Sequence, residues 1–537
     1  MAAEQPTTER LALALAPPGA RPAAPSAVEG AAGRFLARER GKAPRNKGKS
    51  PEMGSSSAAE AVGDQPNPRD DDDDLDWTAA PVADVAMPPP TPAYPVDERE
   101  RDVLLIKLLR STVDAVAIGK LDLASDGMRW VADLASPDGR SLQRLASAFA
   151  EALALYVIVP FHGLCRLLQL PQAAPPGEVA AARHRFRGIC PFVRIAGASA
   201  NLSILEAMDN EEGVVHVVDL GGSDINQWVE LVRLFAARPR GPPGLLRVTV
   251  VNEADDVLSA AEGYLTAEAQ RLDINFTFRR VQSSIDALTG VGGALGIVAG
   301  QSLAVIANLQ MHRLLAYRKE ARNGKGPAGE QSAQHTMTTK ADALLRAIRG
   351  LSPKLMVLTE QEADHNVDEL QPRVWNAMNY YAALFDAVEE SAPLVSPGDR
   401  ASVERWLLGE EIRDIVVCVG SARRERHEKL ERWGARMVAA GFSPATMAKA
   451  LGMTEALARQ VAAGGGAGAA VGVLRAVQAG GCFPMICWSN KPVFSVSTWT
   501  VRRSVVRPPE AAADAGASGS HHGGGPASSS AAMVFDV

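Results

Sequence analysis

Two short β-branched runs on either side of one amphipathic segment constrain the fold of this 537-residue chain more than any other feature. The runs are Val214–Leu220 (VVHVVDL) and residues 246–252 (LRVTVVN). Between them, apolar side chains recur at helical spacing, in Trp228, Leu231, Val232 and Phe235. Runs with little polar alternation are typical of parallel strands that are covered on both faces. The segment therefore predicts a β-α-β unit.

Further β-branched or apolar runs are strand candidates with helical patterns between most of them: 302–307, 354–360, 412–419, 484–488 and 493–499. The economical assembly is a mostly parallel sheet that ends in an antiparallel hairpin, with helices on both faces. Upstream, apolar residues recur at helical spacing over 105–116 and 141–156. We therefore expect a folded region over 97–507, mainly helical at 97–207 and an α/β core at 208–507.

The two ends of the chain, residues 1–96 and 508–537, are rich in Ala, Pro, Gly and Ser and have almost no apolar periodicity. Such segments bury too little surface to offset the entropy of ordering, so we expect both to be disordered. Seven basic residues between Arg34 and Lys49 are interrupted by one acid, Glu39. A nuclear import receptor can read this pattern, and a merely solvating tail is the alternative.

Charge and cysteine usage exclude several classes of protein. The formal net charge of −6 argues against a chain that coats nucleic acid or anionic membrane by charge alone. The longest apolar stretch, at 153–160, falls short of the ~20 residues that span a bilayer. Five cysteines without a CxxC pair favour a reducing compartment. We expect an intracellular, soluble protein.

The loop after the first strand is the feature most typical of an enzyme. Ligands of open α/β sheets lie beyond the carboxyl ends of strands, where Asp219, Gly221 and Gly222 let backbone approach an S-adenosylmethionine-like ligand. Glu253, just past the second run, would then bind a ribose. However, the third glycine of the nucleotide fingerprint is absent, and a carboxylate, Asp224, stands in the loop. A tight structural turn is the favoured alternative, and no cofactor is expected.

Two histidines are weighed as catalytic or metal-binding residues. His216 lies inside the first run, where a satisfied core histidine is more common than a catalytic one. His365, between Asp364 and Asn366, can serve acid–base chemistry or a metal. No second histidine or cysteine stands at a ligand spacing, so a hydrogen-bonded loop is favoured. We expect no metal site and no enzymatic activity.

A charged segment over 423–428 (RRERHE) is expected to open a helix whose apolar stripe is Leu430, Trp433 and Met437. Its basic residues can contact phosphate, but interleaved glutamates lower the local potential. Intramolecular salt bridges and caps are therefore the favoured interpretation.

Read in order, these segments resemble the GRAS family of plant regulators over nearly all of the patterned region. Residues 135–153 resemble the family's first leucine-rich region, and residues 309–315 fall in or just after the second. The counterpart of the VHIID motif is Val215, His216, Val217, Val218 and Asp219. The counterpart of the PFYRE region is Pro353, Tyr380, Tyr381, Arg424, Glu425, Arg426, His427 and Glu428. The counterpart of the SAW motif is Trp488, Ser497 and Trp499.

The resemblance implies a helical cap on a Rossmann-like core that is related to methyltransferases but does not catalyse a reaction. It implies transcriptional regulation in the nucleus through DELLA-type GRAS proteins and indeterminate-domain zinc-finger factors, as a homo- or hetero-dimer, with DNA contacted indirectly and no membrane partner. Residues 359–366 and 423–433 are most similar to the scarecrow-like branch, which is associated with gibberellin signalling and root development. The alternative is an S-adenosylmethionine-type methyltransferase or small-molecule binder that uses the loop from Asp219 to Gly222.

Overall fold

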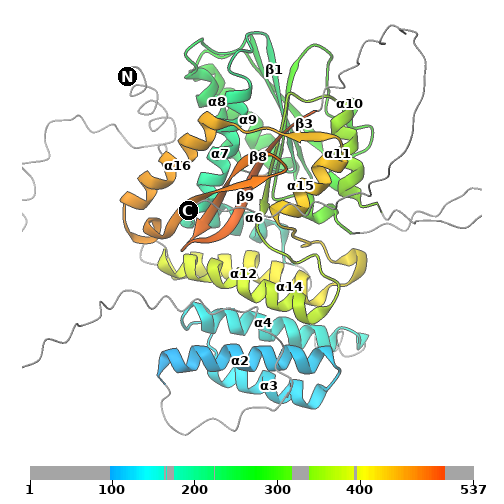
Figure 1. Cartoon of the computed structure of the whole chain (residues 1–537), viewed down its shortest axis with the longest axis vertical. Coiled ribbons are helices and arrows are strands. Elements are labelled where there is room, and N and C mark those ends of the chain that lie inside the picture. Colours follow the sequence, from blue (N-terminus) through cyan, green and yellow to red (C-terminus); the bar gives the residue numbers. More distant parts are fainter. Residues whose placement is uncertain are drawn as a thin grey trace, which may run out of the picture. The chain divides into compact units, whose positions relative to one another are not determined.

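The computed structural model describes residues 97–162, 165, 174–222, 224–316, 338–391 and 396–501 (Figure 1). Residues 1–96 and 508–537, which are expected to be disordered, lie outside these ranges. Residues 502–507, which the expected core includes, also lie outside them.

The core is a nine-stranded sheet in the order β3-β2-β1-β4-β5-β9-β8-β7, with β6 also paired to β9. The parallel strands are β1 (Val214–Leu220), β2 (Leu245–Asn252), β3 (Phe276–Gln282), β4 (Ser302–Asn308) and β5 (Leu355–Gln361). The antiparallel strands are β6 (Phe442–Pro444), β7 (Val471–Gln478), β8 (Gly481–Trp488) and β9 (Lys491–Val501). The expected β-α-β unit and antiparallel hairpin are confirmed, and β7 extends the hairpin to three strands.

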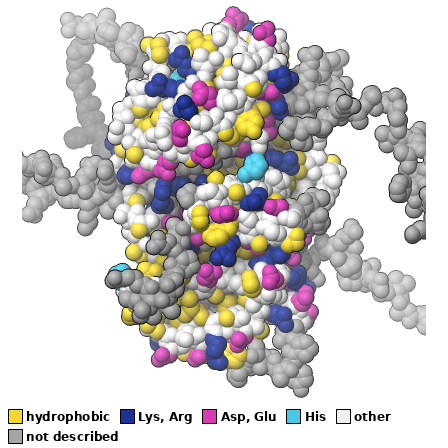
Figure 2. Space-filling view, turned by 180° about the vertical axis from the view of Figure 1, so that it is seen from behind, with side chains coloured by type: hydrophobic (Ala, Val, Ile, Leu, Met, Phe, Trp, Pro, Cys, Tyr) yellow, Lys and Arg dark blue, Asp and Glu magenta, His cyan; other side chains and the backbone are white. Residues whose placement is uncertain are grey.

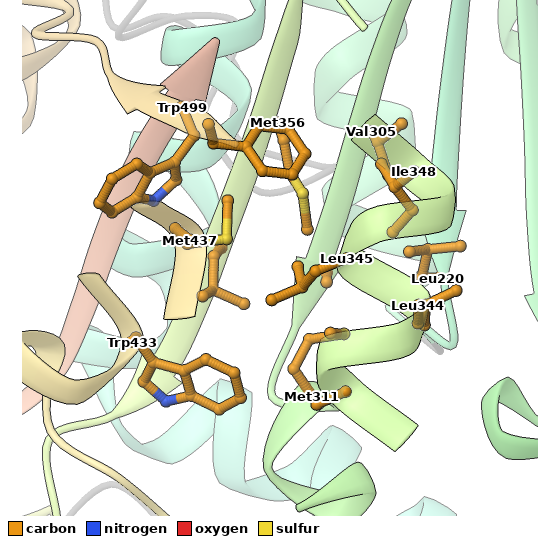
Figure 3. Packing of buried hydrophobic residues seen from close by; sticks show 14 of the residues in the cluster. Leu220, Val305, Met311, Leu344, Leu345, Ile348, Met356, Trp433, Met437 and Trp499 are labelled. Carbon is orange, nitrogen blue, oxygen red and sulfur yellow. The ribbon is translucent and has the colours of Figure 1, made fainter. Parts of the chain in front are cut away.

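Helices cover both faces of the sheet. One face is packed by α7 (Pro191–Ala207), α8 (Ile225–Ala236) and α9 (Asp255–Arg271), which contact one another in series (Figure 1). The other face is packed by α11 (Lys340–Gly350) and α15 (Leu430–Ala439). Figure 3 shows Trp433, Met437, Leu345, Met356 and Trp499 in one packed hydrophobic cluster between these two helices and the sheet. Because this core joins parallel to antiparallel strands, it fixes the carboxyl ends of β4 and β5 in place.

A layer of helices lies beside the sheet and combines two distant parts of the chain. Its first part is α2 (Glu98–Ala117), α3 (Leu121–Leu134) and α4 (Ser141–Ile158). Its second part is α12 (Leu370–Glu390) and α14 (Gly409–Val417), which both contact α4 (Figure 1). The expected helical cap on an α/β core is therefore confirmed, and α12 and α14 contribute to it.

The remaining described α-helices are α6 (Pro176–Ile189), α10 (Val291–Ala294), α13 (Pro397–Val403) and α16 (Ala448–Ala463). The short helical turns are the π-helical η4 (Glu404–Leu408) and the 3-10 helices η1 (Ile285–Ala287), η2 (Met311–Leu314), η5 (Gly420–Ala422) and η6 (Gly466–Ala470). No single described helix is long and apolar enough to cross a membrane. The bent pair Gly177–Ile189 and Pro191–Ala207 passes that test together by length and composition, as buried core helices also do.

Two predicted elements are wrong. The run 412–419 was expected to be a strand, but it falls mostly in α14, because Ile412, Ile415 and Val416 are spaced to bury one face of a helix. The helix expected to open at Arg423 begins at Leu430 instead. Residues 423–429 precede it without helical structure, and most of their side chains turn into the protein.

Candidate functional site

The loop after β1 is closed by hydrogen bonds within the protein. One carboxylate oxygen of Asp219 accepts the backbone N–H of Gly222 at 2.8 Å, and the other accepts the indole N–H of Trp228 at 2.7 Å. The carbonyl oxygen of Gly222 accepts Nδ2 of Asn252 at 2.9 Å. Burial raises the pKa of Asp219 to about 6, and these donors oppose the shift. Both backbone polar groups of Gly222 are thus occupied inside the protein.

Glycine is required at position 222 because a Cβ there would lie 2.2 Å from Oδ2 of Asp219. Gly221 has a φ of +94°, a conformation that glycine adopts without strain. At the start of α8, Asp224 accepts the backbone N–H of Gln227 and forms an ion pair with Arg187. A carboxylate therefore already occupies this helix N-terminus, where an anionic ligand would otherwise bind.

Glu253 does not join Asp219 and Gly222. Its side chain is exposed, and it lines a groove of about 730 Å³ together with Gly221 and Asn252. Asp219 and Gly222 line a separate, neighbouring cavity of about 210 Å³. Of the four residues of the predicted cofactor site, Asp219 and Gly222 therefore line the cavity, whereas Gly221 and Glu253 line the groove.

The cavity lies at the carboxyl ends of β1, β4 and β5, and side chains from α6, α7 and η4 complete its wall. Three buried oxygen atoms in its lining have no hydrogen-bond partner: the amide acceptors Oδ1 of Asn308 and Oε1 of Gln361, and the hydroxyl Oγ1 of Thr359, which can donate or accept. Apolar side chains such as Phe186 and Phe494 form another part of the wall. Because an unpartnered buried acceptor is unfavourable, the cavity favours a ligand that carries hydrogen-bond donors on an apolar body.

Next to this cavity is a buried cluster, the imidazole cluster, made of His312, Glu360, His365, Glu425 and His427. Each of these side chains is less than 10% exposed. Nδ1 of His312 lies 2.6 Å from Oε2 of Glu360, and Nε2 of His312 lies 2.9 Å from Oε2 of Glu425. Nδ1 of His365 lies 2.9 Å from Nδ1 of His427.

The histidines of the cluster have opposite pKa shifts. Burial lowers the pKa of His312, but the carboxylates of Glu360 and Glu425 outweigh it and raise the pKa to about 9. Burial lowers the pKa of His365 to about 3 and that of His427 well below its usual range. His365 and His427 are therefore neutral at physiological pH, and His312 carries a proton between two carboxylates.

The residues that carry the family resemblance form much of the interior. His216 is fully buried in β1, and its Nε2 lies 2.8 Å from Oγ1 of Thr249. Tyr380 donates its hydroxyl to the carbonyl of Val493 at 2.9 Å, and Tyr381 donates to Glu411 at 2.8 Å. Other buried motif residues are Val215, Val217, Val218, Pro353, Arg426, Glu428, Trp488, Ser497 and Trp499. Arg424 differs from these because its side chain is exposed.

Sequence reasoning missed the imidazole cluster. It considered His365 alone, because no other histidine stood at a ligand spacing, whereas the fold brings His427 and His312 to it from 62 and 53 residues away. The available signal was the placement of all three histidines close after predicted strands or inside motif segments. Parallel strands bring such positions to one edge of the sheet.

A model of the GRAS domain family matches residues 105–500 of this chain. The chain belongs to the GRAS domain family. Scarecrow-like protein 3 of Arabidopsis thaliana is 36% identical over 447 residues, which cover 75% of this chain and 90% of that protein. Scarecrow-like transcription factor PAT1 of Arabidopsis thaliana is 30% identical over 63% of this chain and 66% of its own length. These similarities confirm the expected family and its scarecrow-like branch.

A solved GRAS structure agrees with the architecture. The crystal structure of SCL7 in Oryza sativa matches with a TM-score of 0.60 and 25% sequence identity, over 74% of this chain and 99% of that one. The expected Rossmann-like GRAS fold is therefore confirmed by structural similarity as well as by sequence.

Proposed function

We propose that this GRAS protein is a nuclear transcriptional co-regulator without enzymatic activity, which acts through protein–protein interactions in gibberellin-linked growth and root development. The observation that carries the proposal is the 36% identity to Scarecrow-like protein 3, which extends over 90% of that protein. The transcription factor named among the relatives supports a role in transcription.

Its partners, in this proposal, are DELLA-type GRAS proteins and indeterminate-domain zinc-finger factors, and a homo- or hetero-dimer is one of its working forms. The proposed contact with DNA is indirect. On the face shown in Figure 2, the described Lys and Arg side chains are interspersed with Asp and Glu rather than gathered in one basic patch. Such a surface lacks the concentrated positive charge with which proteins neutralise a phosphate backbone.

The test is a binding titration with the purified full-length chain against a DELLA protein and an indeterminate-domain zinc-finger protein, separately. We expect saturable binding to both proteins. A gel shift with duplex DNA across a salt series runs in parallel and is expected to show binding only when the zinc-finger protein is present. Tight, sequence-dependent DNA binding by the chain alone would overturn the indirect mode, and absence of binding to either protein would overturn the partner assignment.

A matched pair of variants separates partner contact from folding. Arg424→Ala removes an exposed side chain of the PFYRE region, whereas Arg426→Ala removes a buried one that donates to the side chain of Asn366 and the carbonyl of Gly420. We expect Arg424→Ala to keep the unfolding midpoint of the wild type, so any loss of binding reports a partner contact. We expect Arg426→Ala to lower the midpoint, because it removes a buried side chain together with its two part-buried hydrogen bonds.

A second candidate function is the binding of a small molecule, with or without methyl transfer, and the unpartnered acceptors of the cavity favour it. Calorimetric titration and thermal unfolding with S-adenosylmethionine test the methyltransferase version. Heat of binding and a raised midpoint in the wild type, both lost in Thr359→Val, would support it. No heat and no shift would remove S-adenosylmethionine as the ligand.

A further inference from the structure

The imidazole cluster has the arrangement of a metal site. His312 comes from η2, directly after β4; Glu360 and His365 come from the end of β5 and the loop after it; and Glu425 and His427 come from the segment before α15. Three of these residues, His312, Glu425 and His427, offer ligand atoms that all lie within 4.8 Å of one another. Two imidazoles and one carboxylate are a common ligand set for first-row divalent transition metals, and an ion that binds here would displace the proton held between His312 and Glu425.

The distances between the candidate ligand atoms suit one shared ion. Oε2 of Glu425 lies 2.9 Å from Nε2 of His312 and 3.4 Å from Nε2 of His427. Two ligand atoms that are each about 2.1 Å from one ion lie about 3.0 to 3.4 Å apart at angles of about 90 to 110°. The cluster therefore requires little rearrangement to surround an ion.

Both rings are oriented by partners on their other nitrogen. Nδ1 of His312 faces Glu360, and Nδ1 of His427 faces Nδ1 of His365. Metal-binding histidines usually engage the second ring nitrogen in this way, which fixes the ring and directs the free nitrogen to the metal. Glu360 and His365 thus stand where the outer shell of a metal site stands.

Two ring nitrogens of the cluster lack a hydrogen-bond partner, Nε2 of His365 and Nε2 of His427, and the second faces the candidate ligands. Nε2 of His427 is buried and has no hydrogen bond, although it points toward Glu425 from 3.4 Å. A buried ring nitrogen without a partner is unfavourable, and a metal ion would supply the missing interaction. His427 itself is fully buried, so water at the protein surface does not reach it.

We propose that His312, Glu425 and His427 bind a divalent transition-metal ion of the zinc class, with Glu360 and His365 as its outer shell. Three protein ligands leave one coordination position open. His312 and Glu425 both line the cavity of about 210 Å³, so a water molecule or a ligand atom in the cavity can complete the coordination. The site therefore links metal binding to occupancy of the cavity.

The test uses the purified full-length chain after removal of metal with a chelator. We expect roughly one Co²⁺ per chain to bind and to give the visible absorption of a site with nitrogen and oxygen ligands, and we expect Zn²⁺ to displace it and raise the unfolding midpoint. Failure of the wild type to bind Co²⁺, with an unfolding midpoint that Zn²⁺ leaves unchanged, would overturn the proposal. The cluster would then be held by its hydrogen bonds alone.

Variants locate the ion without relying on one substitution that can prevent folding. Glu425→Gln removes a ligand, and it is expected to abolish the Co²⁺ spectrum. His365→Asn leaves all three ligands in place, and it is expected to weaken affinity about 10- to 100-fold, as the loss of an outer-shell partner does. His162→Ala, which removes an exposed histidine, is the control and is expected to change nothing. Loss of the spectrum in His162→Ala alone would place the ion on the surface and overturn the assignment.

Discussion

Trp499 shows how a residue of the SAW motif acts through the core. Its side chain is fully buried in β9, its indole donates to Oγ of Ser497 at 2.9 Å, and its ring lies 5.5 Å from that of Phe483. We predict that Trp499→Ala lowers the free energy of unfolding by about 3 to 5 kcal/mol, because it opens a cavity at the junction of β5, β6 and β9. Urea denaturation of the full chain measures the change.

The conservative variant Trp499→Phe controls for this prediction, because it keeps most of the buried ring and loses only the hydrogen bond to Ser497. Trp499→Phe should lower the free energy of unfolding by clearly less than Trp499→Ala does. If the alanine variant unfolded at the same urea concentration as the wild type, Trp499 would have to act at an interface instead.

Glu362 provides a pH-dependent contribution to stability. Its buried carboxylate accepts the first backbone N–H of α15, from Leu430 at 3.0 Å, and burial raises its pKa from 4.5 to about 7. The folded state therefore holds this proton more tightly than the unfolded chain does. Below pH 4.5 the shift has no effect, whereas between about 4.5 and 7 it progressively lowers the free energy of unfolding, and above 7 the loss is constant.

We predict that Glu362→Gln removes this pH dependence, because glutamine keeps an acceptor for Leu430 without a charge. Relative to the variant, the wild type should lose up to about 3 kcal/mol of stability as the pH rises from 4.5 to 7. Urea unfolding at a series of pH values checks this, with Glu253→Gln as an exposed control. Parallel curves for the wild type and Glu362→Gln would contradict the pKa shift.

At the scale of elements, Arg144 holds the helical layer together. Its side chain is 2% exposed on α4, and Nε lies 2.9 Å from Glu404 of η4 while Nη1 lies 3.4 Å from Glu389 of α12. We predict that Arg144→Met lowers the free energy of unfolding by about 3 to 5 kcal/mol, since it leaves the carboxylate of Glu404, only 10% exposed, without its cation. The change is measured by urea denaturation.

Arg185→Met is the matched control, since it breaks an arginine–carboxylate pair between α6 and α13 whose side chains are 37% and 43% exposed. Exposed pairs of this kind contribute about 0 to 1 kcal/mol. If both substitutions lowered the free energy of unfolding by the same small amount, the buried ion pairs of Arg144 would contribute no more than an exposed pair, and the prediction would be wrong.

How well an element can be predicted depends on whether its signal is local. The strands β1 and β2 are continuous β-branched runs, so the β-α-β unit follows from sequence alone. The run 412–419 is also rich in β-branched residues, but its apolar residues have helical spacing. Its contacts with α4 and α12 stabilise the helix instead of a strand. β3 is half exposed and β7 follows a glycine-rich stretch, so neither presents a long apolar run.

The candidate site was less predictable than the fold, because its residues meet only through tertiary structure. His312 and Glu425 are 113 positions apart, yet their side chains touch. Asp219 and Gly222 are close in sequence, and their local turn was foreseen as the alternative to a cofactor loop. The sequence therefore predicts an interaction correctly when the interacting residues are a few positions apart. It does not show which histidines are brought into contact by the order of the strands in the sheet.

At the scale of the whole molecule, the motif residues and the terminal segments have separate tasks. Nearly all described motif residues are buried, so they maintain the GRAS fold and are not accessible as a nuclear localisation signal. The basic run between Arg34 and Lys49 lies outside the described residues, in a segment whose composition predicts disorder. An import receptor reads a cluster of positive charge, and the sequence of this run contains one.

We predict that the full chain fused to a fluorescent protein accumulates in the nucleus, and that changing the seven basic residues of this run to glutamine abolishes the accumulation. The folded region should be unaffected, so binding to a DELLA protein in vitro should stay at the wild-type level. Changing Asp70 to Asp74 to asparagine is the control, because it alters a comparable number of charges of the opposite sign in the same segment. If the glutamine variant still entered the nucleus, the signal would have to lie in the folded region or arrive with a bound partner. Comparing import with and without the DELLA protein would then distinguish these two routes.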